Sequence, residues 1–134
     1  MTPKVVITVA AVFNAIHGIA FVLTAGEMAK MGVPNISEDA FINGKGALEI
    51  AAMFNLFLAS VLFFARSIDA SSARKVAQGT GVGFILLFIG VVYHMMTLLP
   101  EQAPTMGAAV AFGLVTLWAN YVAFIKKDEP TAQA

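Results

Sequence analysis

The sequence predicts an all-α fold in which four transmembrane helices run up, down, up and down through a bilayer, with both termini cytoplasmic. Three observations support this prediction. The 134 residues are 59% hydrophobic and only 12% charged, whereas soluble domains carry about 25% charged residues. Four apolar stretches reach the length of about 20 residues that a helix needs to cross the bilayer core. Basic residues gather at the ends of these stretches. The chain, residues 1–134, is therefore expected to form a single integral membrane domain.

Charged residues and prolines bound the predicted spans. Lys4 precedes the first span, Arg66 follows the second, and Lys126 follows the fourth. Pro100 and Pro104 bracket the last connection, where proline suits the end or the first turn of a helix better than its interior. The helices should therefore form two hairpins. The predicted spans cover residues 5–24, 46–65, 76–99 and 104–125.

The first connection, residues 25–45, is the long one. Ser37 stands before Glu38 and Asp39, which is typical of an N-cap followed by acidic residues in the first turn of a helix. The second helix is thus expected to begin well before the membrane. Turn-forming residues precede it, namely Gly32, Pro34 and Asn35.

The distribution of basic residues predicts the orientation. Lys30 and Lys45 fall on one side of the predicted membrane. The other six basic residues fall on the opposite side, and these are Lys4, Arg66, Arg74, Lys75, Lys126 and Lys127. Because cytoplasmic loops carry an excess of Lys and Arg, the side with six basic residues should be cytoplasmic.

Small and polar residues predict how the helices pack. Helices in lipid gain little from hydrophobicity against one another, so close packing depends on small residues and interhelical polar contacts. The third span carries a stripe that should be buried against another helix, formed by Gly79, Gly83, Gly90 and His94. The first and fourth spans carry comparable stripes. These are Ala10, Asn14, His17 and Phe21, and then Ala109, Gly113, Thr116 and Asn120.

Ionisable residues within the spans are the strongest candidates for a site, because each costs at least a few kcal/mol in lipid. They are His17, Glu49 and His94, which lie at roughly 4, 10 and 8 Å from the middle of their spans, all toward the outer side. Asn14 and Asn55 fall near the midplane. We therefore predict an outward-opening polar pocket lined by His17, Glu49, His94, Asn14, Asn55 and Thr97.

Each of these residues also has a structural interpretation. Glu49 could reach interfacial water or pair with Lys45, one turn earlier. His94 could bond to a backbone carbonyl or to Thr97. His17 could join two helices through Asn14 or Asn55.

Several chemistries remain open for the pocket. His17 and His94 could ligate a non-covalently bound b-type haem, since the chain has no cysteine for covalent attachment. With Glu49 they could instead hold a divalent metal such as zinc or iron. Proton exchange between a histidine and a desolvated glutamate is a third alternative. The sequence contains no nucleophile motif, phosphate-binding loop or paired catalytic carboxylates, so an enzyme is the least favoured class.

Three segments of the sequence occur in a characteristic order. They are Phe13-Asn14-Ala15-Ile16-His17-Gly18, the Gly32-Val33-Pro34 turn, and a second helix opening near Gly46-Ala47-Leu48-Glu49. This layout resembles that of small bacterial DoxX-like four-helix membrane proteins. The resemblance implies a left-handed four-helix bundle in the bacterial inner membrane, with a largely unassigned or accessory role and no catalytic residue carried over.

The leading functional prediction is an accessory or small-ligand-binding membrane protein. The alternatives are a haem or metal protein in electron transfer and a small membrane enzyme. The expected partners are the lipid bilayer, a small apolar ligand or another membrane protein, and a second copy of the chain. A formal net charge of zero and the absence of a basic run with interleaved aromatics argue against nucleic-acid binding.

Overall fold

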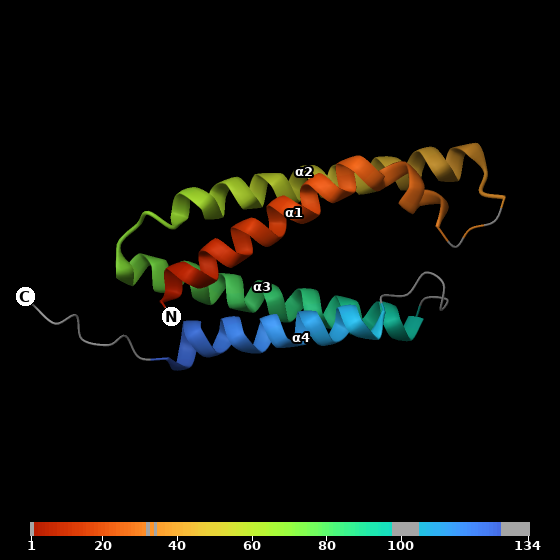
Figure 1. The fold of residues 1–134 in the computed structure, drawn as a ribbon. Helices are drawn as coiled ribbons and strands as arrows, with labels where there is room; N and C mark the ends of the chain where they lie inside the picture. Colours follow the sequence, from red (N-terminus) through yellow and green to blue (C-terminus); the bar gives the residue numbers. More distant parts are fainter. Residues whose placement is uncertain (1, 32, 34, 98–104, 127–134) are drawn as a thin grey trace, which may run out of the picture.

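Four long helices make up nearly all of the described chain (Figure 1). The computed structural model describes residues 2–31, 33, 35–97 and 105–126. The helices are α1 (Pro3–Lys30), α2 (Glu38–Ala65), α3 (Ala70–Thr97) and α4 (Met106–Asn120), and α4 continues as a short π-helix, η1 (Tyr121–Ile125). All four are long and apolar enough to cross a membrane, α4 together with η1. The predicted all-α fold with four membrane-spanning helices is confirmed.

The first three helices are longer than the bilayer core requires. Each has 28 residues and so measures about 42 Å, against about 30 Å for the hydrocarbon core. The helical segments thus extend beyond the predicted spans, and the first connection between helices shrinks to Met31–Ser37. Within it, Asn35 adopts the left-handed conformation, with φ of 59°. The remaining predicted turn residues, Gly32 and Pro34, and the prolines of the last connection lie outside the described residues.

Side-chain caps fix the starts of three helices. The Ser37 hydroxyl accepts a hydrogen bond from the Ala40 N–H at 3.3 Å, as predicted. Thr105 caps α4 in the same way, through the Ala108 N–H at 3.2 Å. Asp69 precedes α3, and its carboxylate accepts bonds from the backbone and hydroxyl of Ser71 and from the backbone of Ser72. These bonds hold the pKa of Asp69 well below its usual range.

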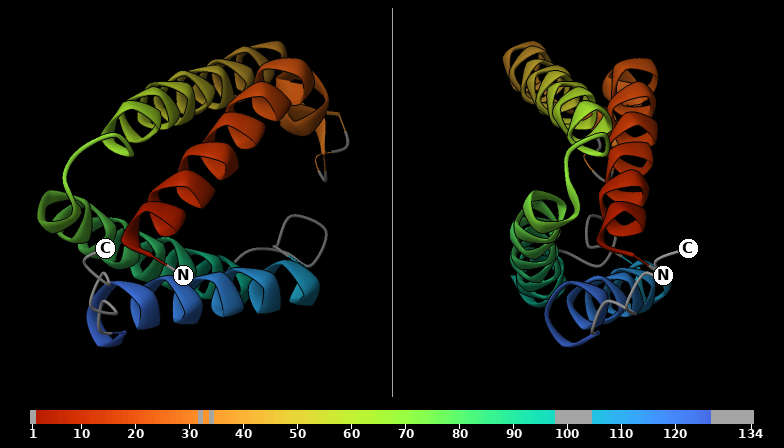
Figure 2. Two further views of the ribbon diagram at one scale, coloured as in Figure 1. Left: turned by 60° about the vertical axis from the view of Figure 1, so that its left-hand side comes forward. Right: turned by 90° about the vertical axis from the view of Figure 1, so that its left-hand side faces the viewer.

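The helices pair as two antiparallel hairpins, α1 with α2 and α3 with α4. The hairpins meet at one end and diverge toward the other (Figures 1 and 2). The buried core sits where they meet, and α1 provides the largest fully buried side chains there, Val6 and Ile7. Leu62 of α2, Ala77 of α3 and Val122 of η1 also belong to it. The hairpins are therefore joined mainly through one half of the molecule.

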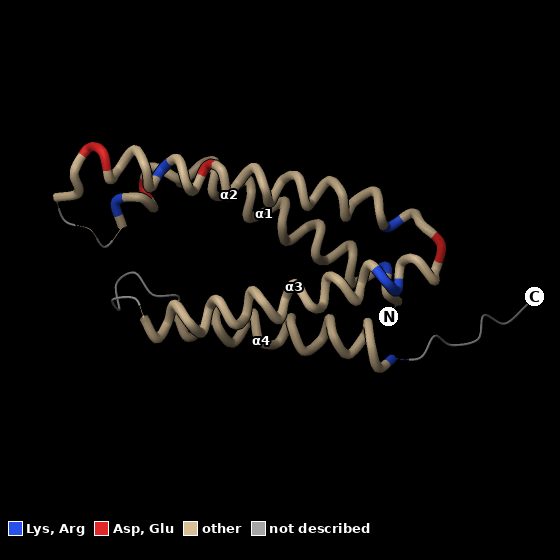
Figure 3. The backbone as a smooth tube through the Cα atoms, turned by 180° about the vertical axis from the view of Figure 1, so that it is seen from behind, with Lys and Arg blue, Asp and Glu red and all other residues tan. Residues whose placement is uncertain are grey.

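Charge divides the two ends of the molecule (Figure 3). We call the end where the hairpins meet the basic end; it holds Lys4, Arg66, Arg74, Lys75 and Lys126, with the single described acidic residue Asp69. The opposite, acidic end holds Glu27, Lys30, Glu38, Asp39, Lys45 and Glu49. Pro3 and Lys126 both lie at the basic end, so the described chain begins and ends on the same side.

Polar side chains of α4 fasten it to α3. The Thr116 hydroxyl donates to the Phe84 carbonyl at 3.2 Å, and the Asn120 amide donates to the Gly81 carbonyl at 3.0 Å. Thr116 is buried, and Gly113 lies against the ring of Phe88. The predicted stripe on α4 is thus the face that meets α3.

The Arg74 guanidinium binds the carbonyl end of η1, the last helical turn of the described chain. In η1 the Lys126 N–H donates to the Tyr121 carbonyl at 2.9 Å, five residues back. The Arg74 guanidinium donates to the carbonyls of Ala123, at 3.4 Å, and Lys126, at 2.9 Å. Free carbonyls at a helix end carry partial negative charge, so this cation stabilises the terminus.

The predicted glycine stripe on α3 is wrong. A Cβ atom built on Gly79, Gly83 or Gly90 would meet no other atom within 4 Å, so no helix packs closely there. The buried face of α3 runs through Ala73, Ala77, Gly81 and Phe84 instead. On this face the carbonyls of Gly81 and Phe84 accept hydrogen bonds from side chains of α4.

Candidate functional site

A cavity of about 490 Å³ lies between α1, α2 and α3. Its size falls within the range of about 300–1,000 Å³ that small-molecule pockets occupy. Most of its lining is apolar, and its polar groups come from one residue of each helix: Asn14 of α1, Asn55 of α2 and Thr80 of α3. Asn14 and Asn55 lie within about 5 Å of the midpoints of their helices. These two polar residues of the cavity therefore lie near the middle of the length of α1 and α2.

The two asparagines present hydrogen-bond acceptors to this cavity. Each side-chain nitrogen donates to a carbonyl of its own helix, Asn14 to Ala10 and Asn55 to Ala51, both at 2.8 Å. A carbonyl can only accept, so the amide oxygens are the atoms that remain. Within the described chain, no hydrogen bond engages either oxygen. Every side-chain oxygen there that is shut off from the surface has a hydrogen-bond partner. Neither oxygen is therefore fully enclosed, and both residues line the cavity.

The hydroxyl of Thr80 is already used. It donates to the carbonyl of Val76, one turn earlier in α3, at 2.9 Å. Its oxygen can still accept a bond from a guest molecule. The cavity thus offers three acceptors and one remaining N–H on each asparagine amide, surrounded by hydrocarbon side chains.

The cavity opens sideways, between α2 and α3. α1 packs closely on both α2 and α3, so its side chains Ala10 and Asn14 form the floor. Rim residues are exposed on the two walls, Phe54 at 69% on α2 and Leu87 at 49% on α3. Gly79 and Gly83 widen the α3 wall because they carry no side chain. A molecule dissolved in the bilayer could reach the cavity without passing through water.

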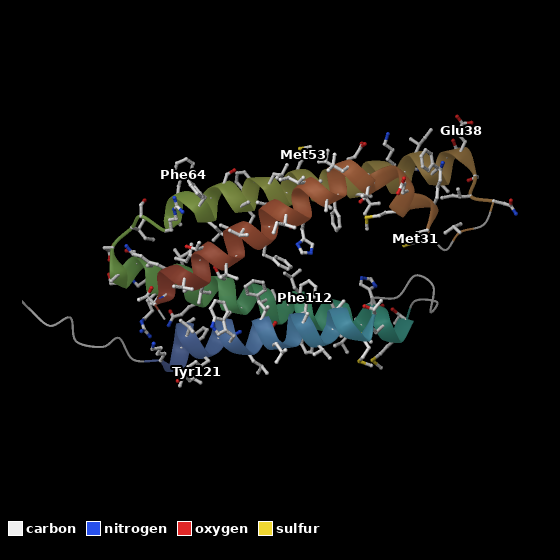
Figure 4. The ribbon with its side chains drawn as sticks, in the orientation of Figure 1. Met31, Glu38, Met53, Phe64, Phe112 and Tyr121 are labelled. Atoms are coloured by element: carbon white, nitrogen blue, oxygen red, sulfur yellow. The ribbon has the colours of Figure 1, made fainter. Side chains whose placement is uncertain are left out.

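His17 lies among aromatic rings between the two hairpins. Its ring centroid is 4.0 Å from that of Phe13, 6.2 Å from Phe21 and 6.4 Å from Phe112. Phe112 points from α4 toward the α1–α2 hairpin, whereas Tyr121 points outward (Figure 4). The Nδ1 atom of His17 lies 2.9 Å from the Phe13 carbonyl, which requires the proton on Nδ1. The predicted contact of His17 with Asn14 or Asn55 is replaced by this bond within α1.

Glu49 and His94 do not point into a shared pocket. Glu49 is half exposed and lies 3.6 Å from the Lys45 ammonium group, as the structural interpretation predicted. His94 is exposed, and its ring centroid lies 5.6 Å from that of the neighbouring Tyr93. Thr97 is also exposed and donates to the Tyr93 carbonyl. These residues lie toward the acidic end, where the hairpins diverge.

The predicted metal site is not assembled. Among the residues that the structure describes, no three His, Cys, Asp or Glu side chains lie close enough to hold a metal ion. The ring contacts of His17 and His94 also do not join these histidines to each other. Of the six predicted pocket residues, the structure places Asn14 and Asn55 at one cavity. Sequence reasoning missed Thr80, although its position one residue after Gly79 was a usable signal.

The fold and this cavity define a multi-pass helical membrane protein with a laterally open, mainly apolar cavity. Comparisons with protein-family models, curated proteins and solved structures gave no match. The resemblance to DoxX-like proteins therefore stays a prediction.

Proposed function

We propose that this protein binds a small, lipid-soluble molecule within the membrane, in the cavity between α1, α2 and α3. The observation that carries the proposal is the pair of accessible amide oxygens, on Asn14 and Asn55, in a mainly apolar cavity beside the middle of α1 and α2. In hydrocarbon an unpaired polar group is costly. A guest that donates a hydrogen bond would relieve this cost.

The chemistry of the lining specifies the class of guest. Apolar side chains such as Leu58 and Phe84 favour a hydrocarbon body. The amide oxygens favour an O–H or N–H donor, and no charged side chain lines the cavity to balance an ionised group. A long-chain alcohol, or another neutral amphiphile with one hydroxyl, fits both requirements.

Two glycine substitutions test the proposal with a matched control. Gly83→Leu should fill the cavity, whereas Gly90→Leu adds the same side chain to open space on the same helix, outside the cavity lining. The probe is a photoactivatable long-chain alcohol, added to the protein in lipid nanodiscs. Labelled peptides should map to the segments around Asn55 and Gly83 in the wild type. Gly83→Leu should abolish that labelling and Gly90→Leu should preserve it.

Equal labelling of all three proteins would refute the proposal, because the probe would then be reporting lipid contact alone. Circular dichroism and elution volume would show that each variant remains folded. A fall in labelling with both substitutions would also count against the cavity, since Gly90 does not line it.

We further propose that the basic end faces the cytoplasm of a bacterium, with the helices in its inner membrane. The excess of Lys and Arg at this end supports the orientation. A reporter fused after Lys127 should be active only in its cytoplasmic form, and one inserted between Met31 and Ser37 only in its exported form. Activity of both on the same side would contradict the orientation.

A further inference from the structure

A second groove, of about 350 Å³, runs between α1 and α2 and ends at a cation. Small or apolar side chains line its walls, among them Ala11 and Ala15 on α1 and Leu56 and Ala59 on α2. Arg66 lines its end, at the basic end of the molecule. The groove shares no lining residue with the cavity described above, so it is a separate site.

The length of the groove matches one leaflet of the bilayer. On α2 its lining extends from Leu56 to Arg66, a rise of about 15 Å along the helix. Half of a hydrocarbon core of about 30 Å has the same thickness. An acyl chain lying in the groove would thus begin at the membrane surface, beside Arg66, and end near the midplane.

The Arg66 guanidinium lies over an aromatic ring and has no anionic partner within the described chain. It stacks over the ring of Phe63, 3.8 Å from the ring centroid, and no described acceptor engages its N–H groups. Lys4 lies one turn before Thr8, a groove residue, on the same face of α1, and it forms no ion pair with any residue that the structure describes. The nearby carboxylate of Asp69 is occupied by Ser71 and Ser72.

We propose that this groove binds an anionic phospholipid, with one acyl chain between α1 and α2 and the phosphate at Arg66. A guanidinium held over an aromatic ring still presents its N–H donors as a fork, which matches the geometry of a phosphate. Lys4 adds a second positive charge at the headgroup level. The site selects by headgroup charge as well as by the fit of one acyl chain. The proposal does not depend on the function assigned to the other cavity.

The test compares two lipids and two charge substitutions. Dioleoyl-phosphatidylglycerol and dioleoyl-phosphatidylcholine are titrated separately into the purified protein in detergent, and bound lipid is counted by native mass spectrometry. Both lipids carry the phosphate, but the choline of phosphatidylcholine adds a positive charge beside Arg66 and Lys4. Wild-type protein should therefore bind phosphatidylglycerol about tenfold more tightly. Arg66→Gln should remove this preference. Lys75→Gln, which removes one charge at the same end but outside the groove, should retain it.

A third variant tests the acyl-chain position. Ser60 is exposed in the groove and bonds only to the Leu56 carbonyl of its own helix, so Ser60→Leu should leave the helices packed. It should weaken binding of both lipids. Unchanged binding in Ser60→Leu, equal effects of the Arg66 and Lys75 substitutions, or no preference for phosphatidylglycerol in the wild type would each overturn the proposal.

Discussion

Two glycines of α3, only two residues apart, should respond in opposite ways to alanine. A Cβ on Gly81 would lie 2.8 Å from Oδ1 of Asn120, whereas a Cβ on Gly83 would meet nothing within 4 Å. Asn120 could move away from the new methyl group only by giving up its hydrogen bond to the Gly81 carbonyl. The same substitution therefore overpacks one site and leaves the other free.

The magnitudes follow from three contributions. Alanine is favoured over glycine in a helix by about 1 kcal/mol. At Gly81 the lost interhelical hydrogen bond costs about 0.6 to 1.7 kcal/mol, and overpacking costs about 1 to 3 kcal/mol more. Gly81→Ala should thus lower the free energy of unfolding by about 2 kcal/mol, while Gly83→Ala should raise it by up to about 1 kcal/mol.

Unfolding in mixed micelles, driven by added dodecyl sulfate and followed by circular dichroism, measures both variants directly. The expected result is a lower midpoint for Gly81→Ala and an equal or higher midpoint for Gly83→Ala than for the wild type. A loss of stability in Gly83→Ala as large as that in Gly81→Ala would refute the reasoning, because it would place another helix against Gly83.

Three further predictions concern the links at the basic end and between α3 and α4. Asn120→Ala removes the bond donated to α3 and should lower the free energy of unfolding by about 0.6 to 1.7 kcal/mol in the same assay. Arg74→Gln releases carbonyls of the last turn, so hydrogen exchange of residues 121–126 should become faster, while unchanged exchange would contradict this role. Because the pKa of Asp69 is lowered in the folded protein from its ordinary value of 3.8, its cap stabilises α3 fully above that pH. The stabilisation is lost progressively as the pH falls from there through the lowered pKa of the folded state. Carboxyl NMR should give a midpoint for Asp69 below the ordinary aspartate value, and Ser71→Ala should raise it.

Local features of the fold could be predicted from the sequence. Ser37 caps α2 because an N-cap depends on a few adjacent residues. The α4 stripe was also predicted correctly, since helices in lipid pack closely through small residues and interhelical polar contacts, which Thr116 and Asn120 make with α3. For α3 the sequence offers two small-residue faces, one through Gly83 and one through Gly81. Which of these faces meets α4 depends on how the two helices pack against each other, and the residue pattern of α3 alone does not reveal it.

The candidate site could be predicted only in part. Asn14 and Asn55 lie deep in adjacent helices, so their approach to a common cavity follows from depth and hairpin pairing. A pocket shared by His17, Glu49 and His94 required the hairpins to remain close at the acidic end. They diverge there (Figure 2), because the buried core that joins them lies at the basic end. Such a tilt depends on packing between distant segments, which periodicity does not reveal.

The central claim is that the amide oxygens in the cavity between α1, α2 and α3 recognise a hydrogen-bond donor. Its most direct test is the labelling affinity of the photoactivatable long-chain alcohol against the matching alkane probe, in wild-type protein and in Asn55→Leu. Leucine resembles asparagine in size but offers no acceptor, and Asn55 makes its own bond only within α2. The wild type should prefer the alcohol by about 2- to 12-fold, the range of one hydrogen bond of about 0.5 to 1.5 kcal/mol. Asn55→Leu should lose much of that preference. Equal labelling by alcohol and alkane in the wild type, or an undiminished preference in Asn55→Leu, would contradict the claim.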